Sequence, residues 1–470
     1  MCGIFGIYSR EEKKELSLLT YFGLYSLQHR GQESAGMALC DGYNIQMHKG
    51  MGLVSDVFKN EDIKKLNGKI SVGHVRYSTT GSSLAGNAQP LAAYYQGGPL
   101  ALTHNGNLVN TDVLRLELEK QGTAFLTSID SEVILNLITR QTDKQNIAEA
   151  ILACMEKLEG AYSLCIMTKD KLIGVRDPYG FRPLCLGRLA DGSYVLSSES
   201  CGLDIVGAEY ERDLEPGEVL VIDRDGCRSY YSSVKVQPKP CVFEYIYFAR
   251  PDSTIEGFSV HETRRKMGAM LYKQLPIEAD VVVPVPDSGI SAAMGFSEAS
   301  GIPYDMGLMK NRYVGRTFIQ PKQELREFAV KLKLNPIREI VAGKKIVLID
   351  DSIVRGTTSG RIVTLLRNAG AKEVHMYITS PPIAYPCYYG IDTTIRKELI
   401  ASVSTVEQIR QYIGADSLTY LSKENLLDIF APVKDSFCLA CFDGEYPIKA
   451  SEQVGVDKYV LETRGKKDGE

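Results

Sequence analysis

The second half of the chain repeats a pattern of continuous apolar strand, short turn and helix. ADVVVPVPDSG (279–289) precedes a helical pattern at 290–300, and KKIVLIDDSIVRG (344–356) precedes another at 357–370. A third apolar run, EVHMYITSPP, begins at residue 373. Strands without alternating polar residues are typical of a parallel sheet that helices cover on both faces. The pattern therefore predicts an α/β domain in this half.

The first half of the chain is dense in glycine and has short apolar runs that are typical of strands. Helical patterns separate these runs at 132–141 and 146–160. The change between the two halves coincides with three prolines, Pro238, Pro240 and Pro251. A chain of 470 residues, at ~100–200 per domain, fits this division. We predict two domains, 2–235 and 236–470.

Composition excludes several classes of protein. The formal net charge of −4, with 24% charged and 44% hydrophobic residues, argues against nucleic-acid binding through bulk positive charge and against disorder. No apolar run approaches the ~18 residues of a membrane span, and the opening MCGIFGIYSR lacks the pattern of a signal peptide. Eleven cysteines are too few, and odd in number, for a disulfide scaffold. We expect a cytoplasmic protein that binds neither membrane nor nucleic acid.

Cys2 follows Met1 directly, and a small residue at this position normally permits removal of the initiator methionine. The chain would then begin with a cysteine whose own α-amino group has a reference pKa of ~7.7–8.0. Such an amine can accept the thiol proton and later return it to a leaving amine. A cysteine in the second position can equally be an ordinary residue, so the neighbouring motifs decide between the two interpretations.

Five polar, glycine-rich turns each follow or enter an apolar strand in the first half: LQHRGQESAG (27–36), GHVRYSTTG (73–81), NAQPL (87–91), LTHNGNLVN (102–110) and SIDSEV (128–133). Such turns gather where a backbone approaches a ligand. Together with the opening CGIFGI they resemble, in order, the glutamine-hydrolysing domain of N-terminal-nucleophile amidotransferases. The resemblance continues through RDPYGFRPL (176–184) and SSES (197–200), and it implies an αββα sandwich.

The resemblance assigns roles to five residues. Cys2 would be the nucleophile, and Asn105 with the backbone N–H of Gly106 would form the oxyanion hole. Arg76 would bind the α-carboxylate of glutamine, and Asp130 would accept its α-ammonium. Other interpretations exist: Asp130 as a helix cap, Asn105–Gly106 as a hairpin turn, and Arg76 as an exposed charge. The histidines of these motifs are expected to be structural, because the amine already supplies the base: His29, His74 and His104.

Asp350 and Asp351 end an apolar strand, at the edge where open α/β sheets bind ligands. The following loop opens a helix whose backbone N–H groups and hydroxyls suit a phosphate. No Gly-Lys-Ser/Thr is present, which argues against ATP. The stretch resembles the phosphoribosyl-diphosphate motif of type I phosphoribosyltransferases, although an acidic turn that caps a helix is the simpler alternative. The resemblance implies binding of phosphoribosyl diphosphate by Asp350, Asp351, Ser352, Arg355, Gly356, Thr357 and Thr358.

Two further segments fit this resemblance. Ser288, in PVPDSGISAA (284–293), lies in the loop that would receive the pyrophosphate, and with Asp350 and Asp351 it would hold Mg²⁺. KNRYVGRTFIQP (310–321) is similar to the mobile loop that closes over the substrate, or is simply a basic surface loop. Its cationic residues are Lys310, Arg312 and Arg316, and the resemblance implies that Lys310 and Arg312 bind phosphoribosyl diphosphate.

The ordered pairing of both halves resembles the glutamine phosphoribosylpyrophosphate amidotransferase family. It implies an N-terminal-nucleophile sandwich followed by a phosphoribosyltransferase domain with a parallel sheet. The implied reaction converts phosphoribosyl diphosphate, glutamine and water into 5-phosphoribosylamine, pyrophosphate and glutamate, the first committed step of de novo purine biosynthesis. The family also implies purine nucleotide inhibitors, a homotetramer and an internal passage for ammonia.

Four cysteines form a separate pattern. Cys438 and Cys441 make a C-x₂-C pair, with Cys241 and Cys387 upstream. Alone, such a pair fits a zinc half-site, a redox pair or no site. The resemblance implies a [4Fe–4S] cluster, because family members that carry one have this arrangement of four cysteines. The remaining cysteines are expected to be structural: Cys40, Cys154, Cys165, Cys185, Cys201 and Cys227.

Two other functions compete with the two-step enzyme. One is a regulator that senses phosphoribosyl diphosphate and has an inactive glutaminase, which the intact set of Cys2, Arg76, Asn105 and Asp130 argues against. The other is an amidotransferase with a different acceptor, such as a sugar isomerase or an ATP-dependent synthetase. The acidic strand end and the missing ATP motif argue against that function.

Overall fold

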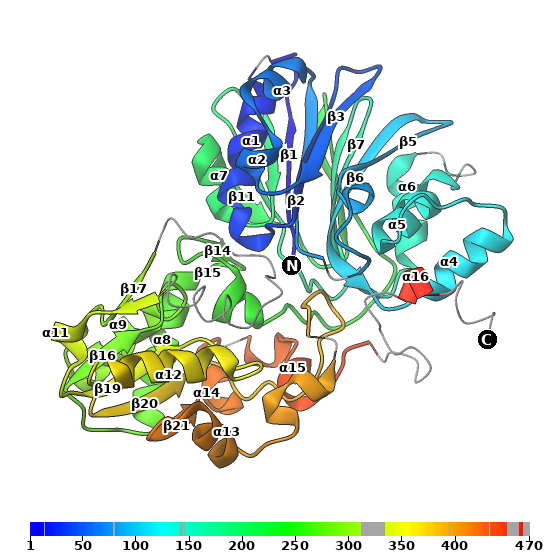
Figure 1. The fold of residues 1–470 in the computed structure, drawn as a ribbon. Coiled ribbons are helices and arrows are strands. Elements are labelled where there is room, and N and C mark those ends of the chain that lie inside the picture. Colours follow the sequence, from blue (N-terminus) through cyan, green and yellow to red (C-terminus); the bar gives the residue numbers. More distant parts are fainter. Residues whose placement is uncertain are drawn as a thin grey trace.

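The computed structural model divides into an upper part with two stacked sheets and a lower part with a parallel sheet (Figure 1). The N-terminus lies between the two parts. The described residues are 1–13, 15–78, 80–141, 144, 146–311, 334–393, 395–431, 433–448 and 460–463.

The first sheet of the upper part has seven antiparallel strands. In spatial order they are β11 (Glu209–Asp213), β9 (Cys185–Arg188), β10 (Tyr194–Ser197), β1 (Gly3–Tyr8), β4 (Ile70–Arg76), β2 (Ser34–Cys40) and β3 (Ile45–Met51). The second sheet has six, also antiparallel. They are β13 (Gly226–Tyr231), β12 (Glu218–Asp223), β8 (Leu172–Arg176), β7 (Gly160–Thr168), β6 (Gly98–Leu108) and β5 (Leu91–Tyr95).

The two sheets pack face to face, and helices cover their outer faces (Figure 1). Alternation along β1 explains this arrangement: Ile4 joins the core between the sheets, whereas Phe5 and Ile7 join the core under the helices. The helices over the first sheet are α1 (Leu16–Ser26), α2 (Val54–Val57), α3 (Asn60–Lys65) and α7 (Ser200–Val206). Those over the second are α4 (Thr111–Lys120), α5 (Asp130–Thr139) and α6 (Ile147–Met155). This is the expected αββα sandwich.

The lower part contains a four-stranded sheet in which all neighbours are parallel. Its strands are β16 (Val281–Pro284), β19 (Lys345–Asp350), β20 (Glu373–Ile378) and β21 (Ser417–Tyr420). Val347 packs under α8 (Val260–Gln274) and α9 (Ile290–Ser300), whereas Ile346 and Leu348 pack under α12 (Thr357–Asn368) and α13 (Val406–Ile413). Both faces of the sheet are therefore buried, as the continuous apolar strands predict.

Shorter elements complete the described chain. The strands are β14 (Thr254–Ile255), β15 (Phe258–Ser259), β17 (Leu308–Lys310) and β18 (Leu334–Pro336). The helices are α11 (Arg338–Val341), α14 (Lys423–Asp428), α15 (Ala440–Asp443), α16 (Val460–Thr463) and a π-helical turn at Glu244–Phe248. Short 3-10 helices span Gln28–Arg30, Ala85–Asn87, Arg396–Glu398, Ile400–Ser402 and Lys434–Ser436.

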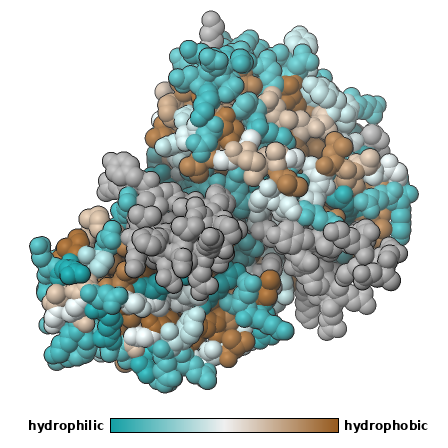
Figure 2. Space-filling view, in the orientation of Figure 1, coloured by the Kyte–Doolittle hydropathy of each residue, from teal (hydrophilic) through white to brown (hydrophobic). Residues whose placement is uncertain are grey.

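The surface is mixed in hydropathy, as the proportions of charged and hydrophobic residues in the sequence lead us to expect. On the face shown in Figure 2, hydrophobic residues are scattered among hydrophilic ones. No described helix has the length and apolarity needed to cross a membrane.

Candidate active sites

Cys2 lies at the start of β1, beside the end of β6. Its backbone N–H donates to Oδ1 of Asn105 at 3.1 Å, and its Sγ lies 3.5 Å from the carbonyl oxygen of Tyr77. The carbonyl oxygen of Cys2 accepts a hydrogen bond from Nε of Arg30 at 2.9 Å. Neighbouring groups therefore hold the backbone of Cys2 on both sides, and the residue is 7% exposed.

The terminal amine of the described chain belongs to Met1, which is buried next to Cys2. Burial lowers the pKa of the Met1 amine to about 5, so this amine is neutral at pH 7. Removal of Met1 would transfer the free amine to Cys2, within hydrogen-bond distance of Asn105. To accept the thiol proton, that amine must be unprotonated and lie next to the thiol.

Asn105 and Gly106 lie inside β6, paired with Ser163 and Tyr162 of β7. They are therefore part of a continuous ladder, and the hairpin-turn interpretation is wrong. Nδ2 of Asn105 is buried and has no hydrogen-bond partner among the described residues, which leaves one donor for a ligand. Gly106 has φ +153°, and a Cβ at this position would lie 2.0 Å from the carbonyl oxygen of Ala161, so only glycine fits.

Arg76 ends β4 and is 3% exposed, so it is not an exposed charge. Its guanidinium donates to the carbonyl oxygens of Thr80 and Ser82, both at 3.1 Å, and of Gly81 at 3.4 Å. These contacts hold the loop after β4 around the cation. Arg76 is followed by Tyr77, whose carbonyl oxygen contacts the Cys2 thiol, so the two predicted residues meet in one site.

Asp130 is the first residue of α5 and not its N-cap, which is Ile129. Its Oδ2 accepts the backbone N–H of Leu108 at 3.1 Å, and its Oδ1 lies 3.5 Å from Nδ1 of His104. Burial would raise the pKa of Asp130, but the charge and hydrogen bond of His104 hold it below the usual value. Asp130 is therefore an anion at neutral pH, next to the strand that carries Asn105.

A cavity of about 500 Å³ lies between the two parts of the chain. From the lower part it is lined by Ser288 and the 350–359 segment, which contains every residue of the predicted phosphoribosyl-diphosphate motif. From the upper part it is lined by Met1, Tyr77 and Arg30. The N-terminal end of the sandwich, next to Cys2, and the predicted phosphoribosyl-diphosphate loop therefore line the same cavity.

Asp350 and Asp351 are each 7% exposed at the end of β19. Burial, followed by the repulsion from Asp351, raises the pKa of Asp350 well above its usual value. Burial also raises the pKa of Asp351, although hydrogen bonds from Ser288 and Ser352 oppose this effect. Two buried carboxylates and a hydroxyl group are hard oxygen ligands of the kind that Mg²⁺ prefers.

The loop after these aspartates leads into α12. Gly356 has φ +75° at the N-cap of the helix, a conformation that favours glycine. The first residues of α12, from Thr357 to Ser359, line the cavity, and a helix N-terminus is a place where a phosphate can bind. Arg355 pairs with Glu398 through Nε at 3.0 Å, and Lys310 pairs with Asp287 at 2.5 Å. Arg312 and Arg316 lie outside the described residues.

The four predicted cluster cysteines lie in neighbouring segments. Cys241 and Cys438 pair as a β-bridge, and the backbone carbonyl of Cys441 accepts two N–H groups from the 384–385 segment before Cys387. All four are free thiols, and burial raises the pKa of Cys241 to about 11. Within the described ranges no group of three or more metal-binding side chains is arranged to hold a metal ion.

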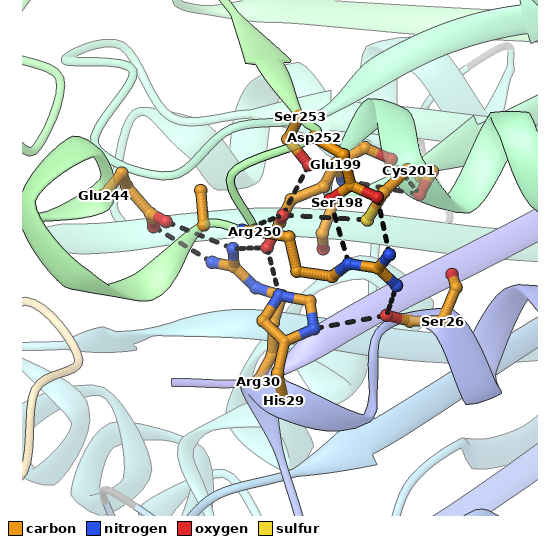
Figure 3. A network of polar contacts seen from close by, with 12 residues as sticks. Ser26, His29, Arg30, Ser198, Glu199, Cys201, Glu244, Arg250, Asp252 and Ser253 are labelled. Atoms are coloured by element: carbon orange, nitrogen blue, oxygen red, sulfur yellow. Dashed lines mark hydrogen bonds and ion pairs between the residues drawn. The ribbon is translucent and has the colours of Figure 1, made fainter. Parts of the chain in front are cut away.

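A buried ionic network joins the two parts (Figure 3). Arg30 donates to Glu199 at 2.5 Å and to Glu244 at 3.0 and 3.1 Å, and Arg182 reaches Glu244 at 3.3 Å. Glu199 also accepts the backbone N–H of Arg250 at 2.9 Å. Local patterns did not identify this network, although Arg30 and Glu199 belong to two of the quoted motifs. Its arginine also holds the carbonyl oxygen of Cys2, so it fixes the nucleophile relative to the lower part.

Comparison with known proteins agrees with this geometry. Residues 74–204 match the model of a glutamine amidotransferase domain, and residues 262–385 match that of a phosphoribosyl transferase domain. The chain is 52% identical to the amidophosphoribosyltransferases of Bacillus subtilis (95% of this chain, 94% of the relative) and Methanocaldococcus jannaschii (96% and 98%). A similar solved structure is that of glutamine phosphoribosylpyrophosphate amidotransferase from B. subtilis, complexed with ADP and GMP. Its sequence is 51% identical to this chain, and the two structures superpose with a TM-score of 0.90. The match covers 96% of this chain and 99% of that chain. This chain belongs to the amidophosphoribosyltransferase family.

Proposed function

We propose that Cys2 performs the glutaminase half of the amidophosphoribosyltransferase reaction. Once Met1 is removed, the α-amine of Cys2 takes the thiol proton, and Sγ attacks the amide carbon of glutamine. Nδ2 of Asn105 and the backbone N–H of Gly106 stabilise the oxygen that becomes negative, at ~2.7–4 kcal/mol per donor. The amine then gives its proton to the departing ammonia. Water hydrolyses the remaining thioester to glutamate and restores the thiol.

Arg76 and Asp130 orient the substrate in this proposal. Both are buried and of opposite charge, which matches the α-carboxylate and the α-ammonium of glutamine. The lowered pKa of Asp130 supports its role as an acceptor that stays ionised at neutral pH.

The second half of the reaction takes place at the end of β19. Asp350 and Asp351 hold the ribose 2- and 3-hydroxyls, directly or through the metal, and the loop from Arg355 to Thr358 holds the 5-phosphate. Ser288 and the two aspartates would hold Mg²⁺, which when bound supplies charge for the leaving pyrophosphate. Ammonia attacks C1 of the ribose, the bond to pyrophosphate breaks, and the extra proton leaves the new amine.

The observation that carries the proposal is the single cavity lined by Met1, Tyr77 and the 350–359 segment. Free ammonia is mostly protonated in water at neutral pH and then does not react as a nucleophile. A cavity that both parts line shortens the path of the neutral molecule from one site to the other. The alternative function as an inactive regulator is not favoured, because the glutaminase residues form an ordered site that a sensor does not need.

A coupled assay tests the proposal. With glutamine, phosphoribosyl diphosphate and Mg²⁺, pyrophosphate and glutamate should appear together and in equal amounts. Glutamate without pyrophosphate would contradict the phosphoribosyltransferase assignment. Pyrophosphate release with ammonia but never with glutamine would contradict the glutaminase assignment.

We also propose that the four cysteines hold a [4Fe–4S] cluster. The pairing of Cys241 with Cys438 and the contact of Cys441 with the segment before Cys387 support this assignment. Binding would release the thiol protons that burial retains. Anaerobically purified protein should be brown and contain about four irons per chain. Colourless protein that contains zinc would contradict the cluster.

The remaining proposals follow from the family. The division into a glutaminase domain, 2–235, and a phosphoribosyltransferase domain, 236–470, fits the two kinds of sheet. Because the related B. subtilis structure is complexed with ADP and GMP, we expect purine nucleotides to inhibit this chain. A cytoplasmic homotetramer is the assembly that we expect, and sedimentation of the purified protein would test it.

A further inference from the structure

Asn107 belongs to the LTHNGNLVN motif, and the proposed reaction gives it no role. It follows the oxyanion pair in β6 and is 4% exposed. Its Oδ1 accepts a hydrogen bond from Oγ1 of Thr80. Its Nδ2 donates to the carbonyl oxygen of Tyr388 in the lower part at 3.0 Å. One amide group therefore contacts a loop of the sandwich and a loop of the other part.

The contact through Thr80 leads to the substrate-binding arginine. The backbone carbonyl of Thr80 accepts a hydrogen bond from Nη2 of Arg76 at 3.1 Å, while its hydroxyl donates to Asn107. The loop that surrounds the guanidinium of Arg76 is thus tied to the strand that carries the oxyanion donors. A shift of Asn107 would move both parts of the proposed glutamine site.

The contact through Tyr388 leads to a tightly packed segment, Cys387–Gly390. Gly390 has φ +105°, and a Cβ there would lie 3.3 Å from the carbonyl carbon of Gly106. Tyr389 stacks on Phe181 with ring centroids 4.3 Å apart, and its carbonyl oxygen accepts a hydrogen bond from Nε of Arg182 at 3.0 Å. The lower part of the chain therefore lies in close contact with Gly106 of β6, the strand that carries the proposed oxyanion donors.

We infer that Asn107 is a positioning residue through which the Tyr388–Gly390 segment of the phosphoribosyltransferase part sets the geometry of the glutamine site. The inference rests on the proposed function, since it concerns the same glutaminase residues. The amide suits this role because it offers a donor and an acceptor in a fixed plane, so it satisfies both loops at once. Burial makes each of these hydrogen bonds costly to lose.

The test uses two variants with matched controls. Asn107→Asp keeps the acceptor for Thr80 but replaces the donor to Tyr388 with an oxygen. Asn110→Asp makes the same change at a half-buried residue whose side chain bonds to Lys157 and Glu159 within the sandwich. Gly390→Ala places a methyl group against Gly106. Gly42→Ala adds a methyl group at the same φ of +105°, where the nearest atom is 3.9 Å away.

We expect both test variants to lower kcat/KM for glutamine about tenfold or more, through KM where the loop around Arg76 moves and through kcat where the oxyanion strand moves. Ammonia-dependent pyrophosphate release should stay within about twofold of the parent, because the sugar-phosphate loop is not touched. The two controls should match the parent in both assays. Should Asn107→Asp fail to fold, Gly390→Ala alone decides.

An unchanged kcat/KM for glutamine in folded test variants would overturn the inference. It would also be overturned if the glutamine-dependent and ammonia-dependent rates fell together, which is the signature of general destabilisation. Failure of the proposed function has a different signature, because the parent protein itself would then release no pyrophosphate with glutamine.

Discussion

Replacement of Asn105 by alanine tests the oxyanion assignment most sharply. The variant removes Nδ2, the buried donor without a partner, and Oδ1, which accepts the backbone N–H of Cys2 at 3.1 Å. Loss of one oxyanion donor costs ~2.7–4 kcal/mol in the transition state, which corresponds to a fall of about 10²–10³ in kcat. Loss of the hydrogen bond to Cys2 adds ~0.5–1.5 kcal/mol, because the amine is then less well placed.

Glutamate release at saturating glutamine measures this effect, and pyrophosphate release with ammonia reports the other site. We expect the first rate to fall by the stated factor and the second to stay close to that of the parent. Asn110→Ala is the matched control, since the side chain of Asn110 bonds to Lys157 and Glu159, away from Cys2. A fall in the glutamine rate of less than about tenfold would refute the oxyanion role of Asn105.

Further perturbations separate the two sites and test the electrostatics. Cys2→Ala should abolish glutamine-dependent product while ammonia still supports pyrophosphate release; loss of both rates would indicate a structural role. Asp350→Asn together with Asp351→Asn should abolish phosphoribosylamine formation and, without Mg²⁺, raise Tm at pH 7. The rise is expected because the raised pKa values mean that ionisation opposes folding as pH increases, and an unchanged or lower Tm would argue against this repulsion. Chelation of Mg²⁺ should stop pyrophosphate release but not glutamate release. Burial lowers the pKa of His74 to about 3, so the folded state resists protonation of this histidine. The free energy of unfolding should therefore fall on acidification, by about 2 kcal/mol between pH 6.5 and 5. Urea unfolding of His74→Asn should show a smaller pH dependence than that of the parent.

Periodicity predicted the helix-covered parallel sheet of the second half, whereas the αββα sandwich of the first half followed from the family resemblance. The continuous apolar strand before Asp350 predicts burial on both faces, and β19 is indeed covered by α8 and α9 on one side and by α12 and α13 on the other. The strand that ends at Arg76, β4, is buried along its whole length. The second sheet and the helices cover its two faces, which a local pattern cannot show.

The site was only partly predictable. Motif order identified Cys2, Asn105 and Asp130, which the fold brings together around β6. The position of Asn105–Gly106 inside a strand was missed, because Asn-Gly is locally typical of turns and only the ladder with β7 shows otherwise. The pairing of Arg30 with Glu244 was missed for a similar reason, since 214 residues separate them along the chain.

The mass of the active enzyme tests the central claim most directly. If the amine of Cys2 is the proton acceptor, the intact mass of protein with full glutamine-dependent activity should lack one methionine residue. Full activity in chains that still carry Met1 would contradict the account, because the nitrogen of Cys2 would then be locked in a peptide bond.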